Sequence, residues 1–185
     1  KSDYRFLAAA PARPRIKVDT AGSPSRGAEK ASVVLVHFAH FSSSLCSDSA
    51  DKIREVMAAF PGRIRWVHRD FFGIQDPDAL YAAEMGRAAF EEGKFWEYHD
   101  RMMALKGKVT QQTVDEAAKD LKLDRKRIGS GQKEGKYLLQ VKEDIGYGVR
   151  IGIQAAPVIF VNGIYFSGTF PYEELKRLVE RELNQ

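Results

Sequence analysis

The fold is decided by one continuous stretch of the sequence, Ser32-Val33-Val34-Leu35-Val36-His37-Phe38-Ala39-His40-Phe41-Ser42-Ser43-Ser44-Leu45-Cys46. Its first half is almost entirely apolar and rich in β-branched residues, which is typical of a strand covered on both faces. After the serines, apolar residues recur at helical spacing from Ser47 to Phe60, and Pro61-Gly62 ends the pattern. The cysteine is therefore expected near a helix N-terminus, where free N–H groups and the helix dipole lower the pKa of a thiol.

The elements that follow predict a β-α-β unit, a helical block and a β-β-α ending. The next strand is expected at 64–71, and strand, helix and strand in close succession imply a right-handed parallel crossover. A helical insertion is expected over about 76–150, with segments near 77–92, 94–106, 111–121 and 132–150 and breaks around 93, 107 and 129–131. Strands at 157–161 and 164–167 meet at Asn162-Gly163, a strong hairpin signal. Pro171 begins a last helix.

Residues 1–30 are expected to form an N-terminal arm or linker ahead of a domain at 31–185. Pro11 and Pro14 disfavour regular structure. Residues 15–19 alternate as a short edge strand would, and 22–27 predict a loop. A chain that starts at Lys1 is typical of a processed or trimmed product.

Charge and hydropathy exclude two classes of protein. The formal charge of +4 resides in residues 1–27, so the rest of the chain is balanced, and a nucleic-acid-binding face is not expected. The preferred interpretation of the basic arm is a solvated tail rather than a contact with an anionic surface. No apolar run approaches the roughly 20 residues that span a bilayer, so no integral membrane segment is expected.

Six motifs, taken in order, resemble the DsbA-like branch of the thioredoxin superfamily over about residues 23–183. They are Ser23-Pro24, Phe38 with Phe41, Arg69-Asp70-Phe71, Gly93-Lys94-Phe95-Trp96-Glu97-Tyr98-His99-Asp100, Gly152-Ile153-Gln154-Ala155-Ala156-Pro157-Val158-Ile159-Phe160-Val161-Asn162-Gly163 and Pro171-Tyr172-Glu173-Glu174-Leu175. The resemblance implies an α/β thioredoxin-like fold with an inserted helical subdomain. It also implies a periplasmic or otherwise extracytoplasmic thiol–disulfide oxidoreductase whose substrates are proteins or peptides with thiols or disulfides.

The resemblance also assigns the site. Ser43-Ser44-Leu45-Cys46 occupies the position of the family's Cys-Pro-x-Cys motif, and Pro157 matches a proline that the family holds in cis, facing that motif. In the family this proline leaves the backbone of the preceding residue, here Ala156, free to pair with an extended peptide. His37 stands where relatives tend to place a buried acid that relays protons.

Two departures put the family's chemistry in doubt. Ser43 removes the attacking thiolate, so a two-thiol cycle cannot run, and His37 removes the carboxylate from the expected proton route. Cys46 is the only cysteine, which leaves at most one-thiol disulfide exchange. Ser44 in place of the family proline favours a natural degenerate site over an engineered Cys→Ser change.

Other interpretations of the same residues stay open. Cys46 is also compatible with an inert, buried thiol, in a non-catalytic chaperone or adaptor that binds peptides at Pro157. Ser43 is compatible with a plain helix N-cap, or with the serine that binds the glutathione thiolate in kappa-class glutathione transferases, which makes glutathione a candidate ligand. A metal site at His37, His40 and Cys46 is disfavoured, because residues three apart in a strand point to opposite faces.

The remaining aromatic motif is expected to be structural. The stretch Phe95-Trp96-Glu97-Tyr98-His99 predicts side chains that pack the helical insertion against the core rather than bind a cofactor.

Overall fold

The computed structural model describes residues 14–185, so the predicted arm lies outside the described residues up to position 13. The described residues form one five-stranded sheet in the spatial order β1-β3-β2-β4-β5. The strands are β1 (Ser25–Gly27), β2 (Val33–Ala39), β3 (Ile64–Asp70), β4 (Val158–Val161) and β5 (Ile164–Ser167). β2 and β3 run parallel, whereas every other neighbouring pair is antiparallel.

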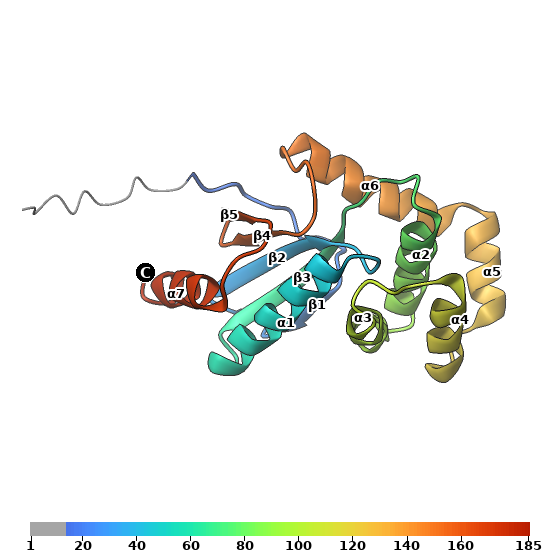
Figure 1. Cartoon of the computed structure of the whole chain (residues 1–185), viewed down its shortest axis with the longest axis horizontal. Coiled ribbons are helices and arrows are strands. Elements are labelled where there is room, and N and C mark those ends of the chain that lie inside the picture. Colours follow the sequence, from blue (N-terminus) through green and yellow to red (C-terminus); the bar gives the residue numbers. More distant parts are fainter. Residues whose placement is uncertain (1–13) are drawn as a thin grey trace, which may run out of the picture.

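Helices flank this sheet and form a subdomain at one end of it (Figure 1). α1 (Ser44–Ala59) connects β2 to β3, and α7 (Tyr172–Leu183) ends the chain. Between β3 and β4 the chain forms α2 (Pro77–Glu91), α3 (Phe95–Ala104), α4 (Gln111–Asp120), α5 (Arg125–Lys133) and α6 (Lys136–Arg150). The α/β fold class predicted from the order of elements is confirmed.

Two local predictions were wrong. Residues 22–27 contain β1, which pairs with β3 through backbone hydrogen bonds that its polar side chains do not signal. The break expected at 129–131 lies inside α5. The N-cap of this helix is Asp124, whose side chain accepts from the N–H groups of Lys126 and Arg127. The real break is at Gly135, which has φ +70°.

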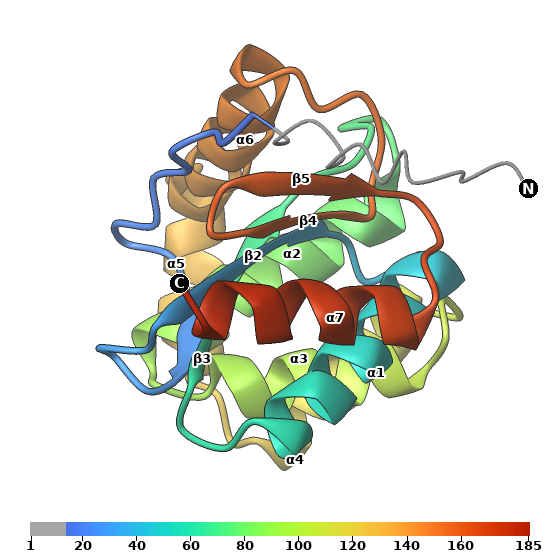
Figure 2. The same ribbon diagram turned by 90° about the vertical axis from the view of Figure 1, so that its left-hand side faces the viewer.

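Alternate residues of β2 face two separate apolar layers. Val33, Leu35 and Ala39 belong to the larger cluster, together with residues of α1, α7 and the helical subdomain. Val36 and Phe38 face the second cluster, which α6 and residues 16–18 help to cover. Figure 2 shows α1 and α7 on one side of the sheet and α6 on the other. A strand buried on both faces is what its continuous apolar sequence predicts.

A buried ion network joins the end of β3 to the helical subdomain. Arg87 on α2 donates to Asp70 at the end of β3 and to Asp144 on α6, and Asp144 also accepts from Arg69 at 2.9 Å. The Arg87 guanidinium and the adjoining His68 hold the pKa of the Asp70 carboxyl at about 2, against the opposing effect of burial. The network therefore fixes the helices relative to the strand that lies beside β2.

In the described part of the chain, no helix is both long enough and apolar enough to cross a membrane.

Candidate functional site

The turn between β2 and α1 carries the predicted site. Ser43 is the N-cap of α1, with an extended backbone (φ −119°, ψ 122°), and its hydroxyl accepts from the Cys46 N–H at 3.2 Å. Serine suits this position because its hydroxyl satisfies one of the free N–H groups of the first turn. The two residues between them, Ser44 and Leu45, are exposed, and Leu45 retains 47% of its accessible surface.

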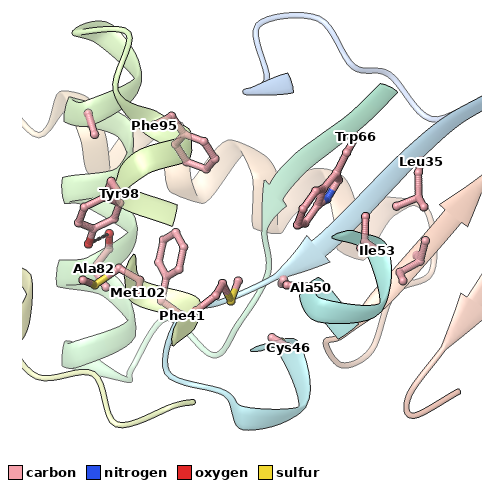
Figure 3. Packing of buried hydrophobic residues seen from close by; sticks show 14 of the residues in the cluster. Leu35, Phe41, Cys46, Ala50, Ile53, Trp66, Ala82, Phe95, Tyr98 and Met102 are labelled. Carbon is pink, nitrogen blue, oxygen red and sulfur yellow. Dashed lines mark hydrogen bonds between the residues drawn. The ribbon is translucent and has the colours of Figure 1, made fainter. Parts of the chain in front are cut away.

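Cys46 is fully buried, in contrast to its exposed neighbours. It lies at the start of α1 beside the apolar cluster that contains Phe41 and Ala50 (Figure 3). Burial raises the pKa of the Cys46 thiol above its ordinary value, while hydrogen bonds with the Ser43 side chain and the His40 backbone act to lower it. Burial has the larger effect, so the native thiol is protonated and poorly reactive near neutral pH.

His37 contacts Cys46 indirectly, through a serine that sequence reasoning missed. The Ser49 hydroxyl lies 2.7 Å from His37 Nε2 and donates to the Cys46 carbonyl at 2.8 Å. Because a hydroxyl has one proton, Nε2 donates to Ser49 when Ser49 donates to the carbonyl. The only sequence signal for Ser49 is its position one helical turn beyond Cys46. The connection reaches the cysteine backbone and bypasses its sulfur.

His37 belongs to a buried row of histidines. Its ring centroid lies 6.4 Å from that of His68, which lies 5.3 Å from that of His99. Burial, and then the two neighbouring histidines, hold the pKa of His37 well below its ordinary value of 6.5, and burial lowers that of His99 to about 3. His37 is therefore neutral at pH 7 and supplies no charge to the site. His99, Phe95 and Tyr98 are core residues, as predicted.

His40 takes no part in this row. It lies beyond the end of β2, with its ring centroid 5.8 Å from that of Phe72. Among the described residues, no three His, Cys, Asp or Glu side chains are grouped so that they could hold a metal ion.

The sheet register places Pro157 at the end of β2 that leads into the serine turn, residues 40–44. Val158, the first residue of β4, pairs with Phe38, so Pro157 comes level with the end of β2. The Ala156–Pro157 peptide bond is cis, Pro157 is buried, and its carbonyl accepts from the Gly168 N–H at 3.1 Å. In the described part of the chain, neither backbone group of Ala156 makes a hydrogen bond.

These features resemble those of known proteins in both sequence and fold. The sequence profile of the family described as thioredoxin matches residues 19–181. The chain therefore belongs to the thioredoxin family. It is 25% identical over 175 residues to the disulfide bond formation protein D of Bacillus subtilis, covering 88% of this chain and 78% of that protein. The crystal structure of oxidised BdbD from Bacillus subtilis superposes with a TM-score of 0.83 at 21% identity, covering 94% of this chain and 99% of that one. The resemblance to DsbA-like proteins is confirmed.

A second set of relatives is much longer. The chain is 28% identical over 165 residues to the Na(+)/H(+) antiporter NhaA 1 of Salinispora arenicola, and the aligned region covers 89% of this chain. It spans 25% of that antiporter's length. The similarity therefore concerns one part of a larger protein.

Proposed function

We propose that this chain is a DsbA-like thioredoxin domain that binds protein or peptide clients with thiols or disulfides, and that it performs at most one-thiol exchange through Cys46. The observation that carries the proposal is the serine turn itself. It presents Ser43 at the helix N-cap, where the family has its attacking sulfur, and retains one buried sulfur behind it.

The exchange that remains is a single step. The Cys46 thiolate attacks one sulfur of a client disulfide, forms a mixed disulfide and releases the other client sulfur as a thiolate. Ser43 has no sulfur with which to resolve that adduct, so a second, external thiol must attack the mixed disulfide to free the protein. The domain would therefore hold a client rather than turn it over.

A second candidate is a non-catalytic peptide-binding adaptor. It is supported by the burial of Cys46 and the raised pKa of its thiol, which slow any exchange. The backbone N–H and C=O of Ala156 have no partner in the described chain, and an extended peptide could use both. The exposed Leu45 would contribute apolar surface on the turn before α1.

The setting of the domain is part of the proposal. We infer an extracytoplasmic location from the family resemblance. From the antiporter relatives we infer that the domain functions beside a membrane cation–proton antiporter or as part of one. The chain matches a quarter of the length of such a protein. Affinity purification of the tagged chain from detergent-solubilised membranes, followed by mass spectrometry, tests this setting. Recovery of the tagged chain without any antiporter would refute the association with an antiporter.

One experiment separates the candidate functions. Native protein is incubated with oxidised glutathione and its intact mass recorded, with a denatured sample as control. An adduct on native protein supports one-thiol exchange, whereas an adduct only after denaturation supports the adaptor. Saturable glutathione binding without an adduct would instead support a glutathione site at Ser43. In parallel, Ser43→Cys is expected to gain disulfide exchange with a model peptide; an inactive but folded variant would count against an exchange-competent scaffold.

A further inference from the structure

The loop between α3 and α4 lies directly on the serine turn that precedes α1. Gly107 has φ +82°, and a Cβ built on it would lie 2.8 Å from the Ser44 nitrogen and 3.2 Å from the Ser43 carbonyl carbon. Contacts below 3.0 Å essentially never occur for a real Cβ, and both atoms belong to backbone that cannot rotate away. A glycine is therefore required for the two backbone segments to approach this closely.

Ion pairs fasten the same loop to the side of α1. Lys106, which has the unusual φ of 52° for a residue with a side chain, pairs with Asp48 at 3.0 Å and also with Asp51. These carboxylates lie nearly one helical turn apart. Behind them, the Ser47 hydroxyl lies 3.7 Å from the Met103 sulfur of α3. The loop thus contacts α1 on its first turn and along its side.

The turn under this loop encloses the cysteine. The Ser43 hydroxyl, which belongs to the turn, accepts from the Cys46 backbone N–H at 3.2 Å. Cys46 is fully buried, although Ser44 and Leu45 in the same helical turn are exposed. The sulfur can therefore meet a reagent only after the turn moves, and the loop packs against the turn where that movement must occur.

We propose that residues 105–109 act as a brace that determines access to Cys46, with Lys106 and Gly107 as its positioning residues. While the brace is seated, the site admits a partner that binds outside the turn, such as an extended peptide. A small disulfide such as oxidised glutathione reaches Cys46 only when the brace is released. This inference deepens the proposed function and rests on it for the identity of the partner, but access to the sulfur is measurable without any exchange.

The test measures alkylation of the single cysteine. The full chain is treated with N-ethylmaleimide, samples are quenched over time, and the modified fraction is read by intact mass. Gly107→Ala is expected to raise the rate by about tenfold or more, because the added Cβ forces the loop away from the turn. Lys106→Ala is expected to raise it about two- to fivefold, as expected for the loss of part-exposed ion pairs. Added salt should speed the wild-type reaction and leave Lys106→Ala nearly unaffected.

Two matched variants control for general effects. Gly62→Ala imposes the same backbone strain, since Gly62 has φ +72°, but no atom lies within 4 Å of its Cβ position. Lys108→Ala removes an exposed lysine from the same loop. Both are expected to react at about the wild-type rate. Urea unfolding of every variant shows whether a faster reaction reflects global instability; if Gly62→Ala and Gly107→Ala are equally destabilised and equally fast, the brace is refuted.

The alkylation and glutathione experiments distinguish failure of the brace from failure of the proposed exchange function. Rapid alkylation of native wild-type Cys46 would overturn the brace and leave the exchange function intact. Faster alkylation of Gly107→Ala, without any glutathione adduct, would support the brace and count against exchange. Unchanged alkylation in both loop variants would overturn the brace whatever the exchange assay showed.

Discussion

Replacing Ser43 by alanine tests the electrostatics of the site most directly. The substitution removes the hydroxyl that accepts from the Cys46 N–H at 3.2 Å. Loss of a serine N-cap costs about 1 kcal/mol of unfolding free energy, within a range of roughly 0.5–2 kcal/mol. For a domain of this size, that loss lowers the Tm by about 2–4 °C. Urea unfolding and thermal melting followed by circular dichroism measure both quantities.

The same substitution is expected to raise the pKa of the Cys46 thiol. Burial already holds this pKa above its ordinary value, and the hydrogen bond with Ser43 opposes that shift. Alanine removes the opposing contribution, so the thiolate appears at higher pH. Because Cys46 is the only cysteine, the pH dependence of the alkylation rate and the ultraviolet absorbance of the thiolate both report this one group.

Ser43→Asp separates the two effects. Aspartate is as good an N-cap as serine and interacts favourably with the helix dipole, so stability should be kept. Its negative charge beside the sulfur should nevertheless raise the pKa of the Cys46 thiol. A Ser43→Ala protein with unchanged stability and unchanged thiol pKa would refute the assigned contact. A Ser43→Asp protein with a lowered thiol pKa would refute the electrostatic argument.

Three further predictions concern the scaffold. Arg87→Met should lower the unfolding free energy by about 3–5 kcal/mol, because it leaves two buried carboxylates without their shared cation; a loss below about 1 kcal/mol in urea would contradict this. His99 has a folded-state pKa of about 3 against an ordinary value of 6.5, so it binds its proton mainly in the unfolded state. The contribution of His99 to stability should therefore be complete above pH 6.5 and fall by about 1.4 kcal/mol per pH unit between pH 6.5 and about pH 3. The lowered pKa of His37 adds to the same decline, and His99→Phe should make the measured slope shallower by one proton. Gly148→Ala places a Cβ 2.6 Å from the Phe71 ring and should cost about 1–3 kcal/mol, whereas Gly146→Ala, in the same helix with its nearest atom at 3.5 Å, should not destabilise.

The main elements could be predicted because each has a side-chain pattern that matches its backbone period. β2 is apolar except for His37 and is buried on both faces, and the hairpin of β4 and β5 turns at Asn162-Gly163 as expected. β1 has no such pattern, since it consists of only three residues, two polar and one glycine, that pair with β3. α5 is short, strongly polar and contains two glycines, so its propensity is low and its Asp124 cap is the main local signal.

The position of the site could be predicted from the sequence, but the burial of its cysteine and its contacts with other segments could not. The strand-to-helix junction places Ser43 and Cys46 in one helical turn, which local pattern alone predicts. The burial of Cys46, the Ser49 contact with His37 and the approach of Gly107 depend on segments that are distant in the sequence. Gly107 was visible only as a break between helices, and nothing local indicates which backbone it would touch.

The contacts at the serine turn show which features of residue 43 the fold uses. An oxygen acceptor at the N-cap stabilises α1, and serine supplies it better than most residues. The position of the Ala156 backbone likewise follows from the pairing of β4 with β2 and uses no side chain at position 43. In the proposed function, peptide binding and thiol exchange therefore depend on different atoms. A buried Cys46 with a raised thiol pKa is suited to resolve a disulfide formed by a neighbouring sulfur, and poorly suited to begin the reaction. A thiol introduced at position 43 would supply an attacking group for disulfide exchange, and it would leave the sheet register beside Ala156 unchanged.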